Sequence, residues 1–353
     1  MDAAATARAL RTHRRAPAWA VAAALFLLLS LAVGLAVGPV HLGVGDMLRS
    51  IGDRLGVPGA VSPLSGTEEA ILWELRLPRV VLGALVGGTL AVAGATYQGV
   101  FRNPLADPYL LGVAAGAGLG ATVAVAYLPD GWSSHEVVPP AAFLGAVVAV
   151  AAAYALGRSA GRERGAAALV LAGVTVAAFF TAVQSFVQQQ NADTLQEVYS
   201  WILGRLPSSG WHDVVLILPY LVLSLVVIVL HRRLLDVLSL GDDEAASLGV
   251  DVRRVRLTLV VAATIGTAAA VAVTGLIGFV GIIVPHAIRL VAGGSYRLLL
   301  PLSFVVGAGF LVLVDAVART ALAPAEVPIG VVTAFLGAPF FAVVLRTSRR
   351  MIG

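Results

Sequence analysis

The sequence predicts an all-α, polytopic membrane protein with about ten transmembrane helices in one compact membrane domain that covers residues 1–353. Three observations favour this fold class. Hydrophobic residues make up 59% of the chain, charged residues make up only 12%, and charge-free apolar runs recur along its whole length. A soluble domain carries about twice this charged fraction, and roughly 20 apolar residues in a helix cross a bilayer.

Eight of the predicted spans are single apolar runs. They lie near residues 17–39, 80–101, 108–128, 137–157, 165–188, 214–231, 298–314 and 327–345. The stretch 257–285 is too long for one ordinary span, and glycines interrupt it. We therefore expect two helices there, at about 254–273 and 276–292, which are joined by a very tight outer turn.

The arginines predict how the chain is oriented. With a cytoplasmic N-terminus and ten alternating spans, 18 of the 24 basic residues lie inside and 6 lie outside, as the positive-inside rule requires. The first apolar run exceeds the 7–15 residues of a signal-peptide core, so we expect a retained helix after a cytoplasmic tail at 1–16. Both termini would be cytoplasmic, in a bacterial plasma membrane.

The composition excludes several classes of function. Without cysteine the chain can form no disulfide, thiolate metal site or cysteine nucleophile, and no histidine or carboxylate pair has metal-ligand spacing. All 24 basic residues are arginines, whereas a P-loop needs a lysine at the nucleotide phosphates. We therefore expect no cofactor on this chain, and if ATP is used, a partner subunit must bind it together with Mg. The arginines flank apolar segments, which argues against nucleic-acid binding.

Ionisable residues are scarce within the spans. The main exception is Asp315, and Arg319 lies four residues later on the same helical face, so the two can pair. Either a helix-end ion pair or a conformational latch fits this spacing. Secondary transporters place ionisable groups near mid-membrane, which makes an ion-coupled secondary transporter the alternative rather than the first choice.

A polar stretch ends the fifth span. Gln184, Ser185 and Gln188 could line a transport pathway, and interfacial solvation explains them equally well. Small residues at four-residue spacing, such as Gly112, Gly116 and Gly120, predict closely packed helices.

Three segments outside the predicted spans carry specific patterns. On the outer side, Arg76 and Arg79 flank Leu-Pro just before the second span, and Arg319 lies on the same side. The guanidinium fork matches a carboxylate, so these arginines could clamp an acidic extracellular partner, while headgroup anchoring is the alternative. On the inner side, the prolines in 102–108 predict a rigid turn.

The third segment is the inner loop 236–253. Ser239 or Asp242 could cap a short helix with acids in its first turn, and Gly249 could end it. Leu240, Ala245 and Leu248 would give this helix an apolar face on which a soluble partner could push. An ordinary solvated loop is the alternative.

At these segments the chain resembles the FecCD family of ABC-importer permeases, which includes the vitamin B12, haem and ferric-siderophore permeases. The resemblance covers nearly the whole chain after the first span. It rests on five segments in the family order: RLPRVVLGALVGGTLAVAGATYQGVFRNPLADPYLLGVAAGAGLGA (76–121), WILGRL (201–206), LSLGDDEAASLGV (238–250), GLIGFVGIIVPHAIRL (275–290) and APAEVPIGVVTAFLGAPFF (323–341).

The resemblance implies a type II ABC importer permease with ten helices, paired as a homodimer around a central pathway. It implies two cytoplasmic ATPase subunits and an external substrate-binding protein that delivers a ferric siderophore, haem or cobalamin, the ferric siderophore being our first choice. It assigns four groups of residues: Arg76, Arg79 and Arg319 to binding-protein docking; Ser239, Leu240, Gly241, Asp242, Glu244, Leu248 and Gly249 to ATPase coupling; Asn103, Leu105, Gly165, Ala166 and Ala167 to an inner gate; and the fifth span, with Gln184, Ser185 and Gln188, to the pathway together with the eighth and tenth spans.

Overall fold

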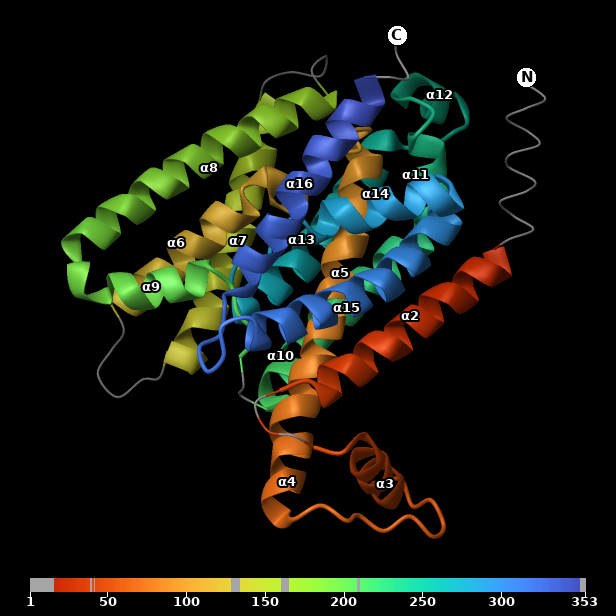
Figure 1. Ribbon diagram of the computed structural model, residues 1–353. Coiled ribbons are helices and arrows are strands. Elements are labelled where there is room, and N and C mark those ends of the chain that lie inside the picture. The colour runs from red at the N-terminus through yellow and green to blue at the C-terminus, as the bar shows by residue number, and fades with distance from the viewer. Residues whose placement is uncertain are drawn as a thin grey trace.

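The protein is described by a computed structural model over residues 16–38, 40, 42–127, 134–159, 165–207 and 210–349, where all regular elements are helices (Figure 1). Within these residues, seven helices are long and apolar enough to cross a membrane, and three shorter apolar helices accompany them. The all-α, polytopic fold class is confirmed.

The spans correspond to those predicted. They are α2 (Ala16–Ala36), α5 (Leu77–Phe101), α6 (Val113–Ala126), α7 (Ser134–Ser159), α8 (Gly165–Gln190), α10 (Trp211–Leu230), α13 (Val252–Thr274), α14 (Val280–Ala292), α15 (Tyr296–Thr320) and α16 (Ile329–Arg349). Shorter elements connect them, namely α3 (Val44–Arg54), α4 (Gly66–Ala70), the π-helix η1 (Ile71–Arg76), the 3₁₀ helices η2 (Pro108–Leu111) and η4 (Ala192–Thr194), α9 (Leu195–Ile202), α11 (Arg232–Leu238) and α12 (Asp242–Ser247).

Helix α5 forms the centre of the bundle. In its most apolar stretch 83% of the residues are buried, and the value is 78% for α13 but only 17% for α2. Helices α13, α14 and α15 pack around α5, which runs through the middle of the molecule in Figure 1. The interior helix contains mostly small residues, whereas the peripheral helices expose leucine, valine and phenylalanine.

Glycines permit this close packing. A Cβ atom on Gly94 of α5 would lie 1.9 Å from the carbonyl oxygen of Gly281 in α14, and one on Gly116 of α6 would lie 2.3 Å from that of Gly145 in α7. Both distances are far below van der Waals contact. The packing predicted for the small residues of α6 is therefore present.

The tight turn between the two helices of 252–292 is also present. Helix α13 ends at Thr274 and α14 begins at Val280, and Gly275 and Phe279 both adopt a positive φ of 69°. One predicted span is shorter than expected, because Gly112 has a φ of 86° and separates the 3₁₀ helix η2 from α6. The left-handed conformation ends one helical turn and starts another.

The segment Arg76–Arg79 is helical, contrary to our expectation that it precedes the second span as a connection. Helix α4, the π-helix η1 and α5 form one continuous apolar helix from residue 66 to residue 101. Pro78 lies at the start of α5, directly after the wide π turn. A proline inside a helix cannot donate to the carbonyl four residues earlier, and here it follows the π turn, where the regular α-helical hydrogen-bond pattern is already interrupted.

The ends of the bundle carry different elements. Helix α12 lies at one end in Figure 1, and α3 and α4 lie at the other. Because α5 extends from α4 towards the end that carries α12, one buried helix connects the two faces of the molecule.

Candidate functional site

A cluster of ion pairs occupies the N-terminal end of α5, on the side that we predicted to be extracellular. The guanidinium of Arg79 donates to Asp315 of α15 (Nη2–Oδ1 2.9 Å) and, as a two-pronged fork, to Glu326 in the α15–α16 connection (3.0 and 2.8 Å). The Asp315 side chain is 2% exposed, whereas that of Glu326 is 50% exposed. The cluster therefore reaches from the protein interior to the surface.

Arg319 completes the buried part of this cluster. Its Nε lies 2.9 Å from the second carboxylate oxygen of Asp315, so the predicted pair within α15 is present. Its two Nη atoms donate to the carbonyl oxygens of Gly34 and Val37 at the end of α2 (2.9 and 3.1 Å). These carbonyls lack helical partners, and a cation near a helix C-terminus is favoured by the helix dipole.

Arg76 caps the same helix end from the other side. It donates to the carbonyl oxygens of Leu35 (2.7 Å) and Val40, and Arg76 as a whole is only 5% exposed. Arg319 is 7% exposed. Arg76 and Arg319, two of the three arginines that we assigned to docking, therefore bind groups inside the protein in this structure. Within this cluster, solvent reaches the pair of Arg79 and Glu326.

The pKa of Glu326 reflects this arrangement. The hydrogen bond from Arg79 is the main cause that lowers the pKa of the Glu326 carboxyl, and partial burial opposes it. The fork therefore holds Glu326 as a carboxylate. A second carboxylate that approached Arg79 from outside would have to compete with this bond.

The predicted coupling segment forms a short helix at the opposite face. Helix α12 carries Asp242, Asp243 and Glu244 in its first turn, as expected. The capping prediction was wrong: the N-cap residue is Gly241, no side chain caps the helix, and the Ser239 hydroxyl donates instead to the carbonyl of Asp236. Gly241 has a φ of 139°, which is a conformation available mainly to glycine.

The end of α12 follows the prediction. Gly249 adopts a φ of 81°, and the Val250 N–H donates to the Ala245 carbonyl oxygen (3.1 Å), which is the hydrogen bond of a Schellman motif. The predicted apolar face is divided between two environments. Ala245 is buried against the protein, whereas Leu240 and Leu248 are 62% and 64% exposed on either side of the helix.

An ion-pair bridge joins α12 to two membrane helices. Asp242 accepts two hydrogen bonds from Nη2 of Arg256 in α13 (2.9 and 3.0 Å), and it also pairs with Arg102 (3.3 Å). Arg102 is the C-terminal cap of α5 and has a left-handed φ of 50°. Asp242 therefore links α12 directly to the C-terminal end of α5.

The predicted inner-gate residues adjoin this bridge in the sequence. The Asn103 side chain accepts a hydrogen bond from the Leu105 N–H (2.9 Å), which fixes the turn, and Leu105 is 41% exposed. Asp107 accepts from the Tyr109 N–H (2.8 Å), and burial raises the pKa of its carboxyl to about 6.

The second predicted gate segment begins α8. The structure describes only the backbone of Gly165 and Ala166, which form the first turn, and Ala167 is exposed.

The predicted pathway residues face in different directions. Gln184 is buried against α6, where its Oε1 lies beside Gly118. Ser185 is exposed and bonds back to the Thr181 carbonyl (2.9 Å), and Gln188 is partly buried. Only part of the polar stretch can therefore line an open surface.

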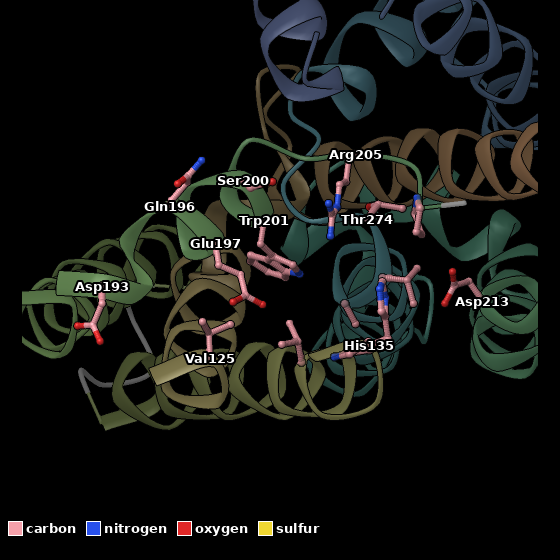
Figure 2. A pocket seen from close by; sticks show the side chains of 15 residues that line it. Val125, His135, Asp193, Gln196, Glu197, Ser200, Trp201, Arg205, Asp213 and Thr274 are labelled. Carbon is pink, nitrogen blue, oxygen red and sulfur yellow. The ribbon is translucent and has the colours of Figure 1, made fainter. Parts of the chain in front are cut away.

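A polar cavity that the sequence did not suggest lies between α7, α9, α10 and the end of α13. Its volume is about 550 Å³. Figure 2 shows the carboxylates of Glu197 and Asp213 and the guanidinium of Arg205 pointing into it. Asp213 is 6% exposed, and its Oδ2 has no hydrogen-bond partner among the described residues. The sequence signal that could have indicated this cavity is Asp213, an acidic residue in the first turn of α10.

The comparisons with known proteins agree with this geometry. The model of the FecCD transport family matches residues 25–347. The chain is 40% identical to the cobalamin import system permease protein BtuC of Halobacterium salinarum over 94% of this chain and 96% of the relative. It is 34% identical to the Fe(3+)-citrate import system permease protein YfmD of Bacillus subtilis over 94% and 95% of the two chains.

A solved structure is similar over almost its full length. It is titled as an inward-facing conformation of an ABC transporter of the metal-chelate type, with a TM-score of 0.81, 28% identity, and coverage of 94% of this chain and 99% of that one. Family model, relatives and fold agree, and the chain therefore belongs to the FecCD transport family and is an ABC transporter permease.

Proposed function

We propose that this chain imports a metal chelate, namely a ferric siderophore, haem or cobalamin, and that separate ATPase subunits drive the transport. The observation that carries the proposal is helix α12, a short element that is flanked by two exposed leucines and joined by ion pairs to α5 and to α13. Such an element suits force transfer from a soluble subunit. The relatives named for cobalamin and Fe(3+)-citrate support the substrate class.

The ATPase subunit would contact the exposed side of α12. Leu240 and Leu248, which flank α12, would enter an apolar recess of the subunit, since removing apolar surface from water is favourable. Ser239, Gly241, Glu244 and Gly249 would shape the helix and its ends. Closure of the ATPase pair would displace α12, and the pairs of Asp242 would pass this displacement to the membrane helices.

The binding protein would dock at the outer end of α5. Its acidic side chain would compete with Glu326 for the fork of Arg79, because both ligands are carboxylates. Arg76 and Arg319 would support this surface from inside by holding α2 and Asp315 in place. Because the acidic side chain of the binding protein would replace Glu326, Arg79 would remain paired with a carboxylate throughout docking.

A second copy of the chain would complete the pathway. Helix α8 exposes Leu171, Phe179 and Phe186 at 67%, 64% and 61%, and α16 exposes Phe335 at 76%. These faces, together with α14, would pair around a central channel in a homodimer. Asn103, Leu105 and the first turn of α8 would lie at its inner mouth. The arginine bias supports the cytoplasmic placement of α12 and of both termini in a bacterial plasma membrane.

The decisive experiment reconstitutes the chain with its candidate ATPase and binding protein in liposomes. We expect ATP-dependent uptake of one chelate among a ferric siderophore, haem and cobalamin, and ATPase stimulation by the loaded binding protein. Uptake that follows an imposed proton or sodium gradient without ATP would refute the proposal and favour the ion-coupled secondary transporter.

A further inference from the structure

A groove between α7 and α13 has features that the transport proposal does not use. Its volume is about 550 Å³. Valine, alanine, leucine and isoleucine side chains of the two helices form most of its wall, and its polar members are Tyr154, Arg158 and Thr264. Both helices have the length and composition of membrane spans, so the groove lies at the depth of the lipid chains.

The length of the groove matches one lipid leaflet. Along α7 its lining extends from Val147 to Arg158. Eleven residues of helix rise by roughly 16 Å, and half of the hydrocarbon core of a bilayer is about 15 Å thick. A single acyl chain would therefore occupy the groove from its charged end to the middle of the membrane.

The charge is placed at the correct end for a headgroup. Arg158 and Leu257 lie at the end of the groove that is formed by the last turn of α7 and the first turns of α13, next in sequence to α12. The Arg158 side chain is exposed, and no ion pair of it is found among the described residues. None of the residues that line the groove is acidic.

We propose that this groove binds one phospholipid with an anionic headgroup from the inner leaflet. The acyl chain would lie between α7 and α13, and the phosphate and headgroup would meet the guanidinium of Arg158. Basic recesses between membrane helices on the cytoplasmic side bind anionic headgroups in this manner. The hydroxyl of Tyr154, which lies one turn deeper, would donate to an ester oxygen of the same lipid.

The test measures which lipids remain on the protein. The full-length chain is reconstituted in nanodiscs that contain equal amounts of phosphatidylethanolamine and phosphatidylglycerol, released into mild detergent, and analysed by native mass spectrometry. The wild type is expected to retain phosphatidylglycerol preferentially. Arg158→Gln should lower this retention about fivefold, which corresponds to one arginine at a membrane surface, without changing the retention of phosphatidylethanolamine.

Matched variants separate the groove from the rest of the surface. Ala155→Phe fills the groove and should remove both lipids, whereas Leu156→Phe places the same aromatic side chain on the opposite side of α7, where Leu156 is 44% exposed. Arg233→Gln removes an exposed arginine of α11 that does not line the groove. Both controls should resemble the wild type. Equal retention of the two lipids by the wild type, or unchanged retention in Arg158→Gln or Ala155→Phe, would overturn the proposal, and neither result would bear on chelate uptake.

Discussion

The bridge at Asp242 provides the most specific prediction about coupling. Asp242→Ala removes the carboxylate that holds α12 to Arg256 and Arg102 at 2.9 and 3.3 Å. Because α12 itself is formed by backbone hydrogen bonds and keeps its buried Ala245, the helix should persist. What the substitution removes is its rigid connection to α5 and α13. We therefore expect ATP hydrolysis to continue while uptake falls.

The magnitude follows from the exposure of the three side chains. Arg256 is 11% exposed, whereas Asp242 and Arg102 are 38% and 43% exposed. The half-exposed Arg102 pair contributes about 0.5 kcal/mol, as surface pairs do, and the doubly hydrogen-bonded Arg256 pair contributes about 1 kcal/mol. Together they amount to about 1.5 kcal/mol, so the ratio of uptake to ATP hydrolysis should fall about tenfold.

The assay measures substrate uptake and phosphate release in the same proteoliposomes. Asp243→Ala is the matched control, because Asp243 is the next residue of the same helix, is exposed, and has no ion pair among the described residues. The charge exchange Asp242→Arg with Arg256→Asp should restore part of the ratio. Full coupling in Asp242→Ala, or an equal loss in Asp243→Ala, would refute the reasoning.

Four further outcomes are expected. Arg79→Glu should abolish capture of the complex by immobilised binding protein, whereas Arg49→Glu, which changes another outer arginine, should not; equal capture by both would remove Arg79 from the docking surface. Asp315→Ala leaves the buried Arg319 without its carboxylate, whereas Arg79 keeps Glu326, and a cost of about 3 kcal/mol should appear as a clearly lower melting temperature. Leu248→Ser should weaken co-purification of the ATPase subunit without lowering the melting temperature of the permease, and a stable, fully assembled variant would contradict this role. Because the pKa of Asp107 is raised to about 6, its contribution to stability is present below about pH 4 and is lost as the pH rises through 6, so the wild type but not Asp107→Asn should show this decline in a pH series of melting temperatures.

The pattern of apolar runs and arginines was sufficient to predict the spans and the tight turn before α14. Hydropathy is a strong signal because a span must be apolar over its whole length. Hydropathy did not predict that Arg76 and Arg79 lie in one continuous helix that includes α5. The π turn at 71–76 that accommodates Pro78 depends on tertiary packing rather than on a local pattern.

The partners of the charged side chains were harder to predict from the sequence than the spans. The spacing of Asp315 and Arg319 revealed one ion pair, because four residues make one helical turn. The connection of the same aspartate to Arg79 joins residues that are far apart in the sequence, and only the fold reveals it. For the same reason Arg76 and Arg319 looked like surface groups, whereas they bind carbonyl groups of α2.

Helix α5 links the two clusters. Arg79 near its outer end and Arg102 at its inner end are 23 residues apart, or roughly 35 Å of helix, and the helix between them is tightly packed against α14 and α15 through glycines. Close packing leaves little space in which α5 could bend, which favours transmission of a displacement along the helix. We therefore expect a displacement applied at Asp242 to reach the fork of Arg79 and Glu326. This requires that Arg102→Ala, which cuts the bridge on the α5 side only, changes the affinity for the binding protein at the opposite face.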